Sequence, residues 1–494
     1  MAENTLYYGD NLDILRLHIK DESVDLVYLD PPFNSNATYN VLFAEHDGAR
    51  AAAQIKAFED TWTWDSEAAE AYQEVVEAGG KVSQAMQAFR TFLGENDMLA
   101  YLSMMAPRLL ELRRVLKPTG SIYLHCDPTA SHYLKMLMDA IFNASNFRNE
   151  IIWSYKRYTA RSNRFQRLHD VILFYGRDAT KTLFNEPRED YGANSGKADS
   201  HYKQDEEGRW CRWQKRKGQE PYKIYLADGK RLGDVWDIPL INASAKERLG
   251  YPTQKPEALL ESIILASSKE GATILDPFCG CGTTIAVAEK LKRSWIGIDV
   301  THLAITLIKH RLMDSYGTAA NFCVIGEPVS LPDAETLAAS DRYQFQWWAL
   351  GLVGARPTEK KKGADKGIDG RLYFHDELST KTKQIIFSVK SGNVTVRDIR
   401  DLRGVLDREK AEIGVLITME KPTTPMRREA ASAGFYESAW KQTRHPHIQI
   451  LAIADLLSGK RIDYPYWSDD ITYKRAAQSQ SGEKSETIRL RNMD

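Results

Sequence analysis

An apolar strand, a glycine-containing loop and a helix precede a second strand in the middle of the chain. The two strands are Ala272–Leu275 and Trp295–Ile298, and each is followed directly by an aspartate, Asp276 or Asp299. This alternation predicts an α/β fold around a largely parallel sheet, because parallel strands need a crossover connection that is usually a helix. Ligands of such sheets bind at the carboxyl ends of the strands, where both aspartates stand.

A further buried strand, Ser23–Leu29, ends at Asp30-Pro31-Pro32-Phe33. Two prolines cannot continue a strand, since each fixes φ and lacks a backbone donor. The turn offers a carboxylate, a proline carbonyl without a ladder partner and an aromatic face. Hydrogen bonds from an exocyclic base amine to Asp30 and to the Pro31 carbonyl would free the conjugated lone pair of the amine, and Phe33 would stack on the base. Taken alone, the segment is equally explained as a structural turn.

The segment between these two motifs predicts further elements of the same sheet. A helical pattern runs from Met98 to Leu116, Lys117–Gly120 stops it, and Ser121–His125 is the next strand. Residues from about 45 to 95 are alanine-rich, polar and irregularly patterned, which predicts an insertion.

The loop after Asp276 does not match a nucleotide-phosphate fingerprint. Its glycines are spaced Gly280-x-Gly282, without a third glycine at Rossmann spacing and without Gly-Lys-Ser/Thr. The loop allows the backbone to approach a ligand closely, and Asp299 is placed to accept hydrogen bonds from ribose hydroxyls. A cationic sulfonium cofactor with a free amino group suits these acidic neighbours better than a pyrophosphate does. A tight structural turn is the alternative for the loop alone.

Length and composition limit the class of protein. A chain of 494 residues predicts two or three domains, and 43% hydrophobic with 27% charged residues is typical of a soluble globular protein. We expect no membrane span and no signal peptide, because apolar runs of the required length are missing. The five scattered cysteines fit a reducing cytoplasm, and Cys279-x-Cys281 lacks nearby partners for zinc.

A net charge of −1 does not by itself indicate a nucleic-acid partner, so the distribution of charge has to decide. Two basic, aromatic-flanked stretches, residues 156–167 and 209–217, alternate guanidinium groups with aromatic rings, a pattern that suits phosphate contact with stacking. The candidate DNA-binding residues are Arg157, Arg161, Arg164, Arg209, Arg212, Lys215 and Arg216. Each stretch alone is as readily a solvated surface.

Together the two motifs and their neighbours resemble the β-class amino methyltransferases of bacterial DNA modification, in which the D-P-P-[FY] segment also precedes the cofactor loop. The resemblance extends from Tyr7 to about Met313, and its other segments are Gly9-Asp10-Asn11, Arg114–Ser121, His169-Asp170 before Ile172–Tyr175, and Tyr251–Pro256. It implies a Rossmann-like S-adenosylmethionine-dependent methyltransferase fold with permuted motif order. It also implies S-adenosylmethionine as cofactor, double-stranded DNA as partner, and a cytoplasmic protein of bacterial or archaeal type.

Carried over position by position, the resemblance gives each motif residue a role. Asp30, Pro31, Pro32 and Phe33 would hold the target amine. The residues implied to bind the cofactor are Asp10, Thr253, Lys255, Asp276, Pro277, Phe278, Gly280, Gly282, Thr283 and Asp299. Asp10 would contact the adenine, and Thr253 and Lys255 would close over the carboxylate side. Asp-Pro-Pro-Phe is more typical of N6-adenine enzymes, and N4-cytosine stays as the alternative.

The C-terminal segment 343–467 resembles the Mrr-like branch of the PD-(D/E)xK nucleases, which implies a smaller α/β restriction-endonuclease-like domain. Asp369 and Lys390 match the motif of that branch, and Asp365 is a candidate extra acid. In such sites the carboxylate, here Asp369, holds Mg²⁺, and the lysine positions the attacking water. Ser388 departs from the pattern, since the wider superfamily has Asp or Glu there and the Mrr-like branch usually has Gln. Serine is a weak Mg²⁺ ligand. An active nuclease and an inactive DNA-binding module therefore both stay open.

The predicted domains are a methyltransferase domain over 1–316, a linker over 317–342, a nuclease-type domain over 343–467 and a poorly ordered polar tail over 468–494, with target recognition at about 182–232. The leading hypothesis is an N6-adenine DNA methyltransferase within a single-chain restriction–modification protein. The alternatives are a solitary methyltransferase with a degenerate nuclease domain, a nuclease that uses its methyltransferase-like domain to recognise DNA, and an RNA or protein methyltransferase. A homodimer stays open as the assembly.

Overall fold

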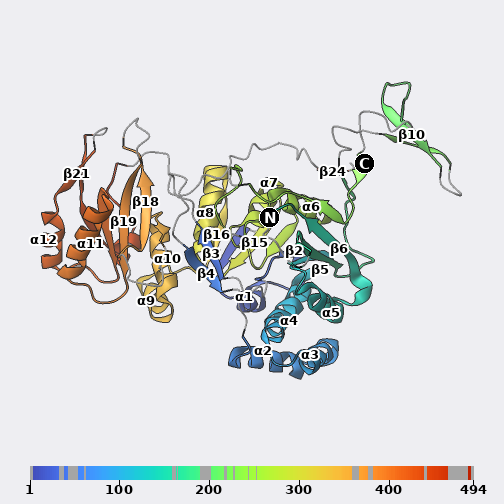
Figure 1. The fold of residues 1–494 in the computed structure, drawn as a ribbon, viewed down its shortest axis with the longest axis horizontal. Coiled ribbons are helices and arrows are strands. Elements are labelled where there is room, and N and C mark those ends of the chain that lie inside the picture. Colours follow the sequence, from blue (N-terminus) through green and yellow to red (C-terminus); the bar gives the residue numbers. More distant parts are fainter. Residues whose placement is uncertain are drawn as a thin grey trace.

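The computed structural model describes residues 4–32, 38–42, 54–59, 63–157, 163, 165–189, 202–215, 220–225, 229–242, 244–251, 253–358, 367–376, 382–438, 442–465 and 488–490. No helix in these ranges is long and apolar enough to cross a membrane. Two sheet-centred units stand side by side, the larger built from the N-terminal part of the chain and the smaller from the C-terminal part (Figure 1).

A nine-stranded sheet forms the centre of the larger unit. In spatial order its strands are β13 (Val235–Asp237), β6 (Phe147–Ser154), β7 (His169–Gly176), β5 (Leu116–Cys126), β2 (Val24–Leu29), β14 (Thr273–Asp276), β15 (Ser294–Asp299), β1 (Asn4–Tyr8) and β16 (Phe322–Ile325). β7 is antiparallel to both of its neighbours, and all other pairs are parallel. This confirms the predicted α/β fold with a largely parallel sheet.

Helices cover both faces of this sheet. One face carries α1 (Asn11–His18), α4 (Asp97–Val115) and α5 (Ser131–Phe142), and the other carries α6 (Glu257–Ser267), α7 (Thr283–Lys290) and α8 (His302–Tyr316). The side chains of β2 alternate between the two cores, Val27 and Leu29 joining the first and Leu26 and Tyr28 the second. Apart from Asp25, the strand is therefore apolar, as expected for a strand that is buried on both faces.

The predicted insertion at about 45–95 contains two helices, α2 (Ser66–Glu77) and α3 (Gly80–Leu93), which pack outside α4 and α5 (Figure 1). The hairpin strands β3 (Thr38–Leu42) and β4 (Gln54–Glu59) lie in the same part of the chain. In the predicted recognition region, β9 (Lys203–Gln204), β10 (Trp210–Gln214) and β11 (Tyr222–Tyr225) form a separate antiparallel sheet. This small sheet projects away from the body of the molecule (Figure 1).

Residues 317–342, which we predicted to be a linker, are instead structured. After the short 3-10 helix η3 (Gly317–Ala319), β16 pairs in parallel with β1 and forms an edge of the large sheet. The helix α9 (Leu331–Ser340) then begins at Ser330, whose side chain makes a capping box with Asp333. A short, half-exposed edge strand carries little apolar periodicity, so the sequence pattern did not reveal it.

The polar tail 468–494 was predicted to be poorly ordered, and that prediction is wrong for three residues. β24 (Ile488–Leu490) pairs antiparallel with β8 (Pro187–Glu189), which also pairs with β12 (Lys230–Arg231). The chain thus returns from the C-terminal unit to the base of the predicted recognition region (Figure 1). The other tail residues lie outside the described ranges.

The smaller unit has a five-stranded sheet. Its strands, in order, are β17 (Arg356–Pro357), β18 (Gly370–Phe374), β19 (Lys383–Lys390), β20 (Ile413–Thr418) and β23 (Ile448–Ala452), and its helices are α10 (Arg342–Leu352), α11 (Val396–Glu409), α12 (Thr424–Ser432) and α13 (Ile453–Leu457). α11 and α12 cover one face, and α9, α10 and α13 cover the other. A two-stranded hairpin, β21 (Phe435–Glu437) with β22 (Arg444–Pro446), completes the unit.

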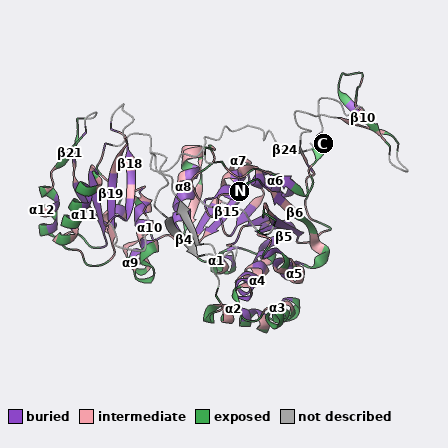
Figure 2. Cartoon of the chain, viewed as in Figure 1, coloured by how far each residue is buried: buried purple, intermediate pink, exposed green. Residues whose placement is uncertain are grey.

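Buried residues concentrate in the strands of both sheets, while the outer faces of α2, α3, α11 and α12 are exposed (Figure 2). The two units meet where α10 packs on α8. There the backbone N–H of His302 donates to Gln344 Oε1 at 3.1 Å. α8 begins just after Asp299, so the smaller unit rests on a helix that starts at the carboxyl edge of the large sheet.

Candidate active site

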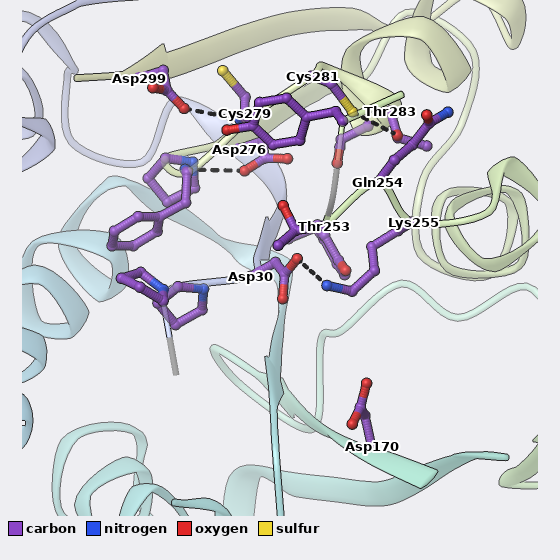
Figure 3. A pocket seen from close by; sticks show the side chains of 18 of the residues that line it. Asp30, Asp170, Thr253, Gln254, Lys255, Asp276, Cys279, Cys281, Thr283 and Asp299 are labelled. Carbon is purple, nitrogen blue, oxygen red and sulfur yellow. Dashed lines mark hydrogen bonds and ion pairs between the residues drawn. The ribbon is translucent and has the colours of Figure 1, made fainter. Parts of the chain in front are cut away.

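A cavity of about 580 Å³ opens at the carboxyl ends of β2, β14 and β15, which is the edge where ligands of such sheets bind. Its volume suits a cofactor together with a base. The predicted site residues that line it are Asp10, Asp30, Pro31, Pro32, Arg157, Thr253, Lys255, Asp276, Pro277, Phe278, Gly280, Thr283 and Asp299 (Figure 3). Phe33 lies outside the described residues.

The buried carboxylate of Asp276 and the half-buried carboxylate of Asp299 form one wall of the cavity. Asp276 Oδ1 accepts from the backbone N–H of Phe278 at 3.1 Å, and Asp299 Oδ2 accepts from that of Gly280 at 2.9 Å (Figure 3). Burial raises the pKa of Asp276 to about 7 and the pKa of Asp299 to about 6. A ligand that brings positive charge or hydrogen-bond donors to this wall would stabilise both ionised forms.

The loop between β14 and α7, residues 277–282, is the predicted cofactor loop. Its conformation depends on a glycine and on a buried arginine. Gly282 has φ of +73° and begins α7, and a Cβ at this position would meet Ile308 Cγ1 at 2.6 Å. Arg311 of α8, only 3% exposed, donates to the carbonyl of Cys281 and to Thr283 Oγ1, both at 3.3 Å. It also donates to Glu257 Oε1 of α6 at 2.7 Å. Arg311 thus joins α8, α6 and the loop, a role that the sequence alone did not indicate.

Asp10, assigned to the cofactor by resemblance, is held by a residue that the sequence did not single out. Arg108 of α4 donates to Asp10 Oδ2 at 2.7 Å and to Asn11 Oδ1 at 2.6 Å. Asn11 in turn donates to the carbonyl of Pro277 at 2.8 Å. This chain of contacts ties the start of α1 to the cofactor loop.

Asp30 follows the last residue of β2 and points into the cavity, where Lys255 forms an ion pair with its Oδ2 atom (Figure 3). Both side chains are largely buried, at 16% and 14% exposed. Lys255 and Thr253 belong to the segment before α6 and reach the same region of the cavity. The resemblance assigned Lys255 to the cofactor, whereas the structure brings it to the carboxylate of the predicted catalytic turn.

A histidine and a second aspartate lie behind Asp30. His125, at the carboxyl end of β5 and fully buried, has Nδ1 2.9 Å from the Tyr28 hydroxyl and Nε2 3.3 Å from Asp170 Oδ2. Its Nδ1 is 3.9 Å from Asp30 Oδ1. The Tyr155 hydroxyl donates to Asp170 Oδ1 at 3.1 Å. The signal for His125 was its place at the end of a predicted strand, but the order of the strands was needed to set it beside Asp30.

The predicted DNA-binding residues fall into separate places. Arg157 lines the cavity, while Arg209, Arg212 and Lys215 lie on or beside the projecting β10 strand. Arg161, Arg164 and Arg216 lie outside the described residues. On the projecting sheet, Trp210 and Trp213 are 49% and 65% exposed, and the Lys223 ammonium stands 5.4 Å from the centre of the Trp213 ring.

The nuclease-type motif of the smaller unit is only partly assembled. Asp369 is buried, and its Oδ2 accepts from the backbone N–H of Val389 at 2.8 Å and from Ser388 Oγ at 3.5 Å. Lys390 stands at the end of β19, and Asp365 lies outside the described residues. Across the described part of the chain, no group of three or more His, Cys, Asp or Glu residues could hold a metal ion. One carboxylate beside a serine does not fit the ligand preference of Mg²⁺.

Comparison with protein families decides the class of the larger unit. Residues 24–310, more than half of the chain, match the family model described as DNA methylase. The chain belongs to the DNA methylase family. The match contains the Asp30 turn, the loop after Asp276 and the predicted recognition region.

Several curated relatives are similar to this methylase domain. Type II methyltransferase M.HpaI of Haemophilus parainfluenzae is 32% identical over 216 residues, which cover 43% of this chain and 59% of M.HpaI. M.EcaI of Enterobacter cloacae is 27% identical, covering 62% of this chain and 69% of the relative. DNA adenine methyltransferase YhdJ of Escherichia coli K12 is 27% identical, and the match covers 62% of this chain and 82% of YhdJ. The chain thus spans less than two thirds of M.HpaI.

Solved structures give a weaker likeness. PvuII DNA methyltransferase, described as cytosine-N4-specific, has a TM-score of 0.35 at 14% identity and covers 62% of this chain and 86% of its own. The M1.HpyAVI–SAM complex has a TM-score of 0.31 at 16% identity, and the match covers 60% of this chain and 92% of the M1.HpyAVI chain. At this level the two likenesses support no inference about the site.

The smaller unit matches a second family. Residues 342–458 are similar to the family described as NACHT-associated inactive Restriction Endonuclease 1. The predicted restriction-endonuclease-like domain is therefore present. That this family is described as inactive agrees with Ser388 at the position where the wider nuclease superfamily has Asp or Glu.

Proposed function

We propose that this protein transfers a methyl group from S-adenosylmethionine to the exocyclic amine of a base in double-stranded DNA, and that the base is adenine, modified at N6. The observation that carries the proposal is the convergence of Asp30, Asp276 and Asp299 on one cavity at the carboxyl edge of the sheet. In this proposal Asp30 binds the target amine, and Asp276 and Asp299 bind the cofactor.

The chemistry follows from the position of Asp30. The target amine donates to this carboxylate and to the Pro31 carbonyl, which frees its lone pair for in-line attack on the methyl carbon. A nitrogen–carbon bond forms, the carbon–sulfur bond breaks, and its electron pair remains on sulfur. The protein contributes positioning and preorganised hydrogen bonding rather than a covalent intermediate. The base has to leave the helix to reach the cavity, at a cost of a few kcal/mol.

The cavity suits S-adenosylmethionine because its acidic wall meets a cationic ligand. The sulfonium and ammonium groups would favour the ionised forms of Asp276 and Asp299, whose pKa values burial has raised to about 7 and about 6. Asp299 and the backbone near Gly280 receive the ribose, and Asp10 with Arg108 borders the adenine. Thr253 and Lys255 would border the carboxylate side of the cofactor.

Adenine is favoured over cytosine by the Asp at the first position of the turn. N4-cytosine enzymes of the β-class usually carry serine there, whereas this chain has Asp30. The name of the relative YhdJ, a DNA adenine methyltransferase, points the same way. N4-cytosine methylation is the competing outcome.

The projecting β9–β11 sheet is our candidate for DNA recognition. A β-ribbon of this size fits the major groove, and exposed indoles beside Arg212, Lys215 and Lys223 suit contacts to bases and phosphates. Arg157, at the mouth of the cavity, would meet the backbone of the flipped nucleotide. The restriction-endonuclease-like domain, with Ser388 beside Asp369, would contribute DNA contacts without cleavage.

Expression in a bacterium that lacks its own DNA methylation tests the proposal. Mass spectrometry of the digested genomic DNA should find N6-methyladenine with the wild-type protein and none with Asp30→Ala, while the exposed control Asp13→Ala should match the wild type. N4-methylcytosine in place of N6-methyladenine would overturn the choice of base. Unmodified DNA with the wild-type protein would overturn the proposed activity.

A further inference from the structure

Methyl transfer leaves the target nitrogen with one proton too many. The reaction converts a cationic sulfonium and a neutral amine into a neutral thioether, a methylated amine and a proton. Asp30 is the group placed to receive that proton, because the amine donates to it. However, Lys255 forms an ion pair with the same carboxylate, and a proton on Asp30 would break that pair. The proton therefore needs a further acceptor.

His125 is placed to be that acceptor. With Nε2–H donating to Asp170, the neutral imidazole leaves Nδ1 as an acceptor, which the Tyr28 hydroxyl meets at 2.9 Å. Burial and the nearby Asp30 raise the pKa of Tyr28 well above its usual value, so Tyr28 stays protonated and donates. Nδ1 also lies 3.9 Å from Asp30 Oδ1. To receive a proton from Asp30, Nδ1 has to exchange the hydrogen bond from Tyr28 for one from the Asp30 carboxyl group.

Asp170 supplies the countercharge that a protonated His125 requires. Burial by itself would raise the pKa of Asp170, but the hydrogen bond and charge of His125, with Lys255 and Tyr155, hold it below the usual value. Asp170 is therefore ionised, and it touches the imidazole nitrogen opposite Asp30. A carboxylate behind an imidazole fixes the tautomer and stabilises the imidazolium, the arrangement that general-base histidines use.

We propose that His125, backed by Asp170, is a positioning residue for methyl transfer that takes the released proton from Asp30 and returns Asp30 to its ionised form. The proton passes from the amine nitrogen to Asp30, then to His125 Nδ1, and leaves to solvent after the product departs. This inference rests on the proposed methyltransferase activity and adds to it the route of the proton.

Several titratable and charged groups surround His125. Tyr28 of β2, Asp30 just after β2 and Asp170 of β7 approach the imidazole nitrogens directly. Tyr155, just after β6, contacts Asp170, and Lys255 contacts Asp30. Asp127 and Arg157 lie further out, near Tyr155. The ring of Trp153 packs edge-on against the imidazole at 5.5 Å. Because Asp170 contacts the imidazole directly, replacing it by asparagine removes the countercharge of the imidazolium.

The test is the single-turnover rate of methyl transfer to unmethylated plasmid DNA, measured from pH 5.5 to 9 at saturating S-adenosylmethionine, so that ionisation of Asp276 does not limit cofactor binding. The wild-type rate should rise with pH and level off, because only a neutral imidazole can accept the proton. His125→Asn should lose this rise and slow the reaction on the order of 100-fold, the lower range for general-base catalysis. Asp170→Asn should keep the rise but move its midpoint to lower pH. His132→Asn, at an exposed position on α5, is the control and should match the wild type.

The outcomes separate this inference from the proposed activity. A wild-type protein that transfers no methyl group overturns the proposed function. An active wild type with the same acid limb in His125→Asn as in the wild type overturns only the proton route. If His125→Asn loses cofactor affinity, which would indicate a folding defect, the midpoint shift of Asp170→Asn decides alone, and an unshifted midpoint overturns the inference.

Discussion

The ammonium group of Lys255 lies against the carboxylate of Asp30, although 225 positions separate the two residues in the chain. The contact exists because β2 and the segment before α6 end at the same edge of the sheet. Lys255 therefore has two candidate duties, positioning of the carboxylate that holds the amine and contact with the cofactor.

Kinetics of Lys255→Met distinguish these duties. If Lys255 positions Asp30, kcat should fall about 10- to 100-fold while the KM for S-adenosylmethionine changes little, because an interaction made in the transition state is removed. Lys255→Arg should recover part of the rate, and Lys246→Met, at an exposed position, should behave as the wild type. A raised KM with unchanged kcat would instead assign Lys255 to the cofactor.

The buried Asp276 makes cofactor binding depend on pH. Its pKa of about 7 in the ligand-free protein means that it is mainly protonated at pH 6 and mainly ionised at pH 8. A cationic ligand prefers the ionised form, so affinity should rise with pH through this range, by at most about tenfold per pH unit for one linked proton. Calorimetric titration with S-adenosylmethionine measures this directly. Asp276→Asn should bind weakly with a flatter dependence, and an equally steep dependence in that variant would contradict the assignment.

Arg311 should act on the cofactor through the loop that it holds. Replacement by Met removes the donors to Cys281 and Thr283 and leaves Glu257 with a weaker partner. We expect the Kd for S-adenosylmethionine to rise about tenfold, or about 1.4 kcal/mol, with a smaller effect on kcat. Arg113→Met, on the exposed side of α4, is the control. Wild-type affinity in Arg311→Met would show that the loop keeps its conformation without the arginine.

Gly282 should tolerate no side chain. Alanine there meets Ile308 and has to adopt a positive φ, which costs on the order of 1–3 kcal/mol before the clash is counted. Thermal unfolding of Gly282→Ala should therefore show a lower Tm and no stabilisation by S-adenosylmethionine. Gly392→Ala is the matched control, since it has an ordinary φ and open space around its Cβ position. Equal Tm values for the two variants would contradict the geometry of the loop.

The projecting sheet should control DNA affinity without affecting the cofactor. Arg212→Ala combined with Lys215→Ala should weaken duplex binding and reduce the slope of log K against log salt by about 1 for each phosphate that the protein no longer neutralises. Lys81→Ala, on exposed α3, should leave the slope unchanged. Fluorescence anisotropy at several salt concentrations measures this, and an unaltered slope in the double variant would remove the sheet from the DNA interface.

The carboxyl edge of the sheet was predictable from the sequence because local motifs mark where its strands end. The strand before Asp30 stops at two prolines, and the strand before Asp276 stops at a glycine loop that only a strand-to-helix turn explains. Since parallel strands align their carboxyl ends, these aspartates were expected to converge, and the cavity contains both.

Contacts between strands that are distant in sequence could not be predicted in the same way. His125 meets Asp30 because β5 lies beside β2, and it meets Asp170 because the antiparallel β7 lies on the other side. Neither neighbour follows from local periodicity. Arg311 is similar, since a charged residue on α8 would usually face solvent, and only the packing of α6 and the cofactor loop buries it. The edge strand β16 was missed because a run of four residues is too short to show a strand pattern.

The central claim is tested most directly by incubating the purified protein with unmethylated duplex DNA and S-adenosylmethionine that carries a labelled methyl group. Two variants are compared with the wild type. Asp30→Asn keeps the shape of the side chain but removes its charge, and Asp13→Asn is the exposed control. We predict that label enters the DNA with the wild type and with Asp13→Asn, and that Asp30→Asn incorporates at least about 100-fold less. Equal incorporation by Asp30→Asn and the wild type would contradict the account.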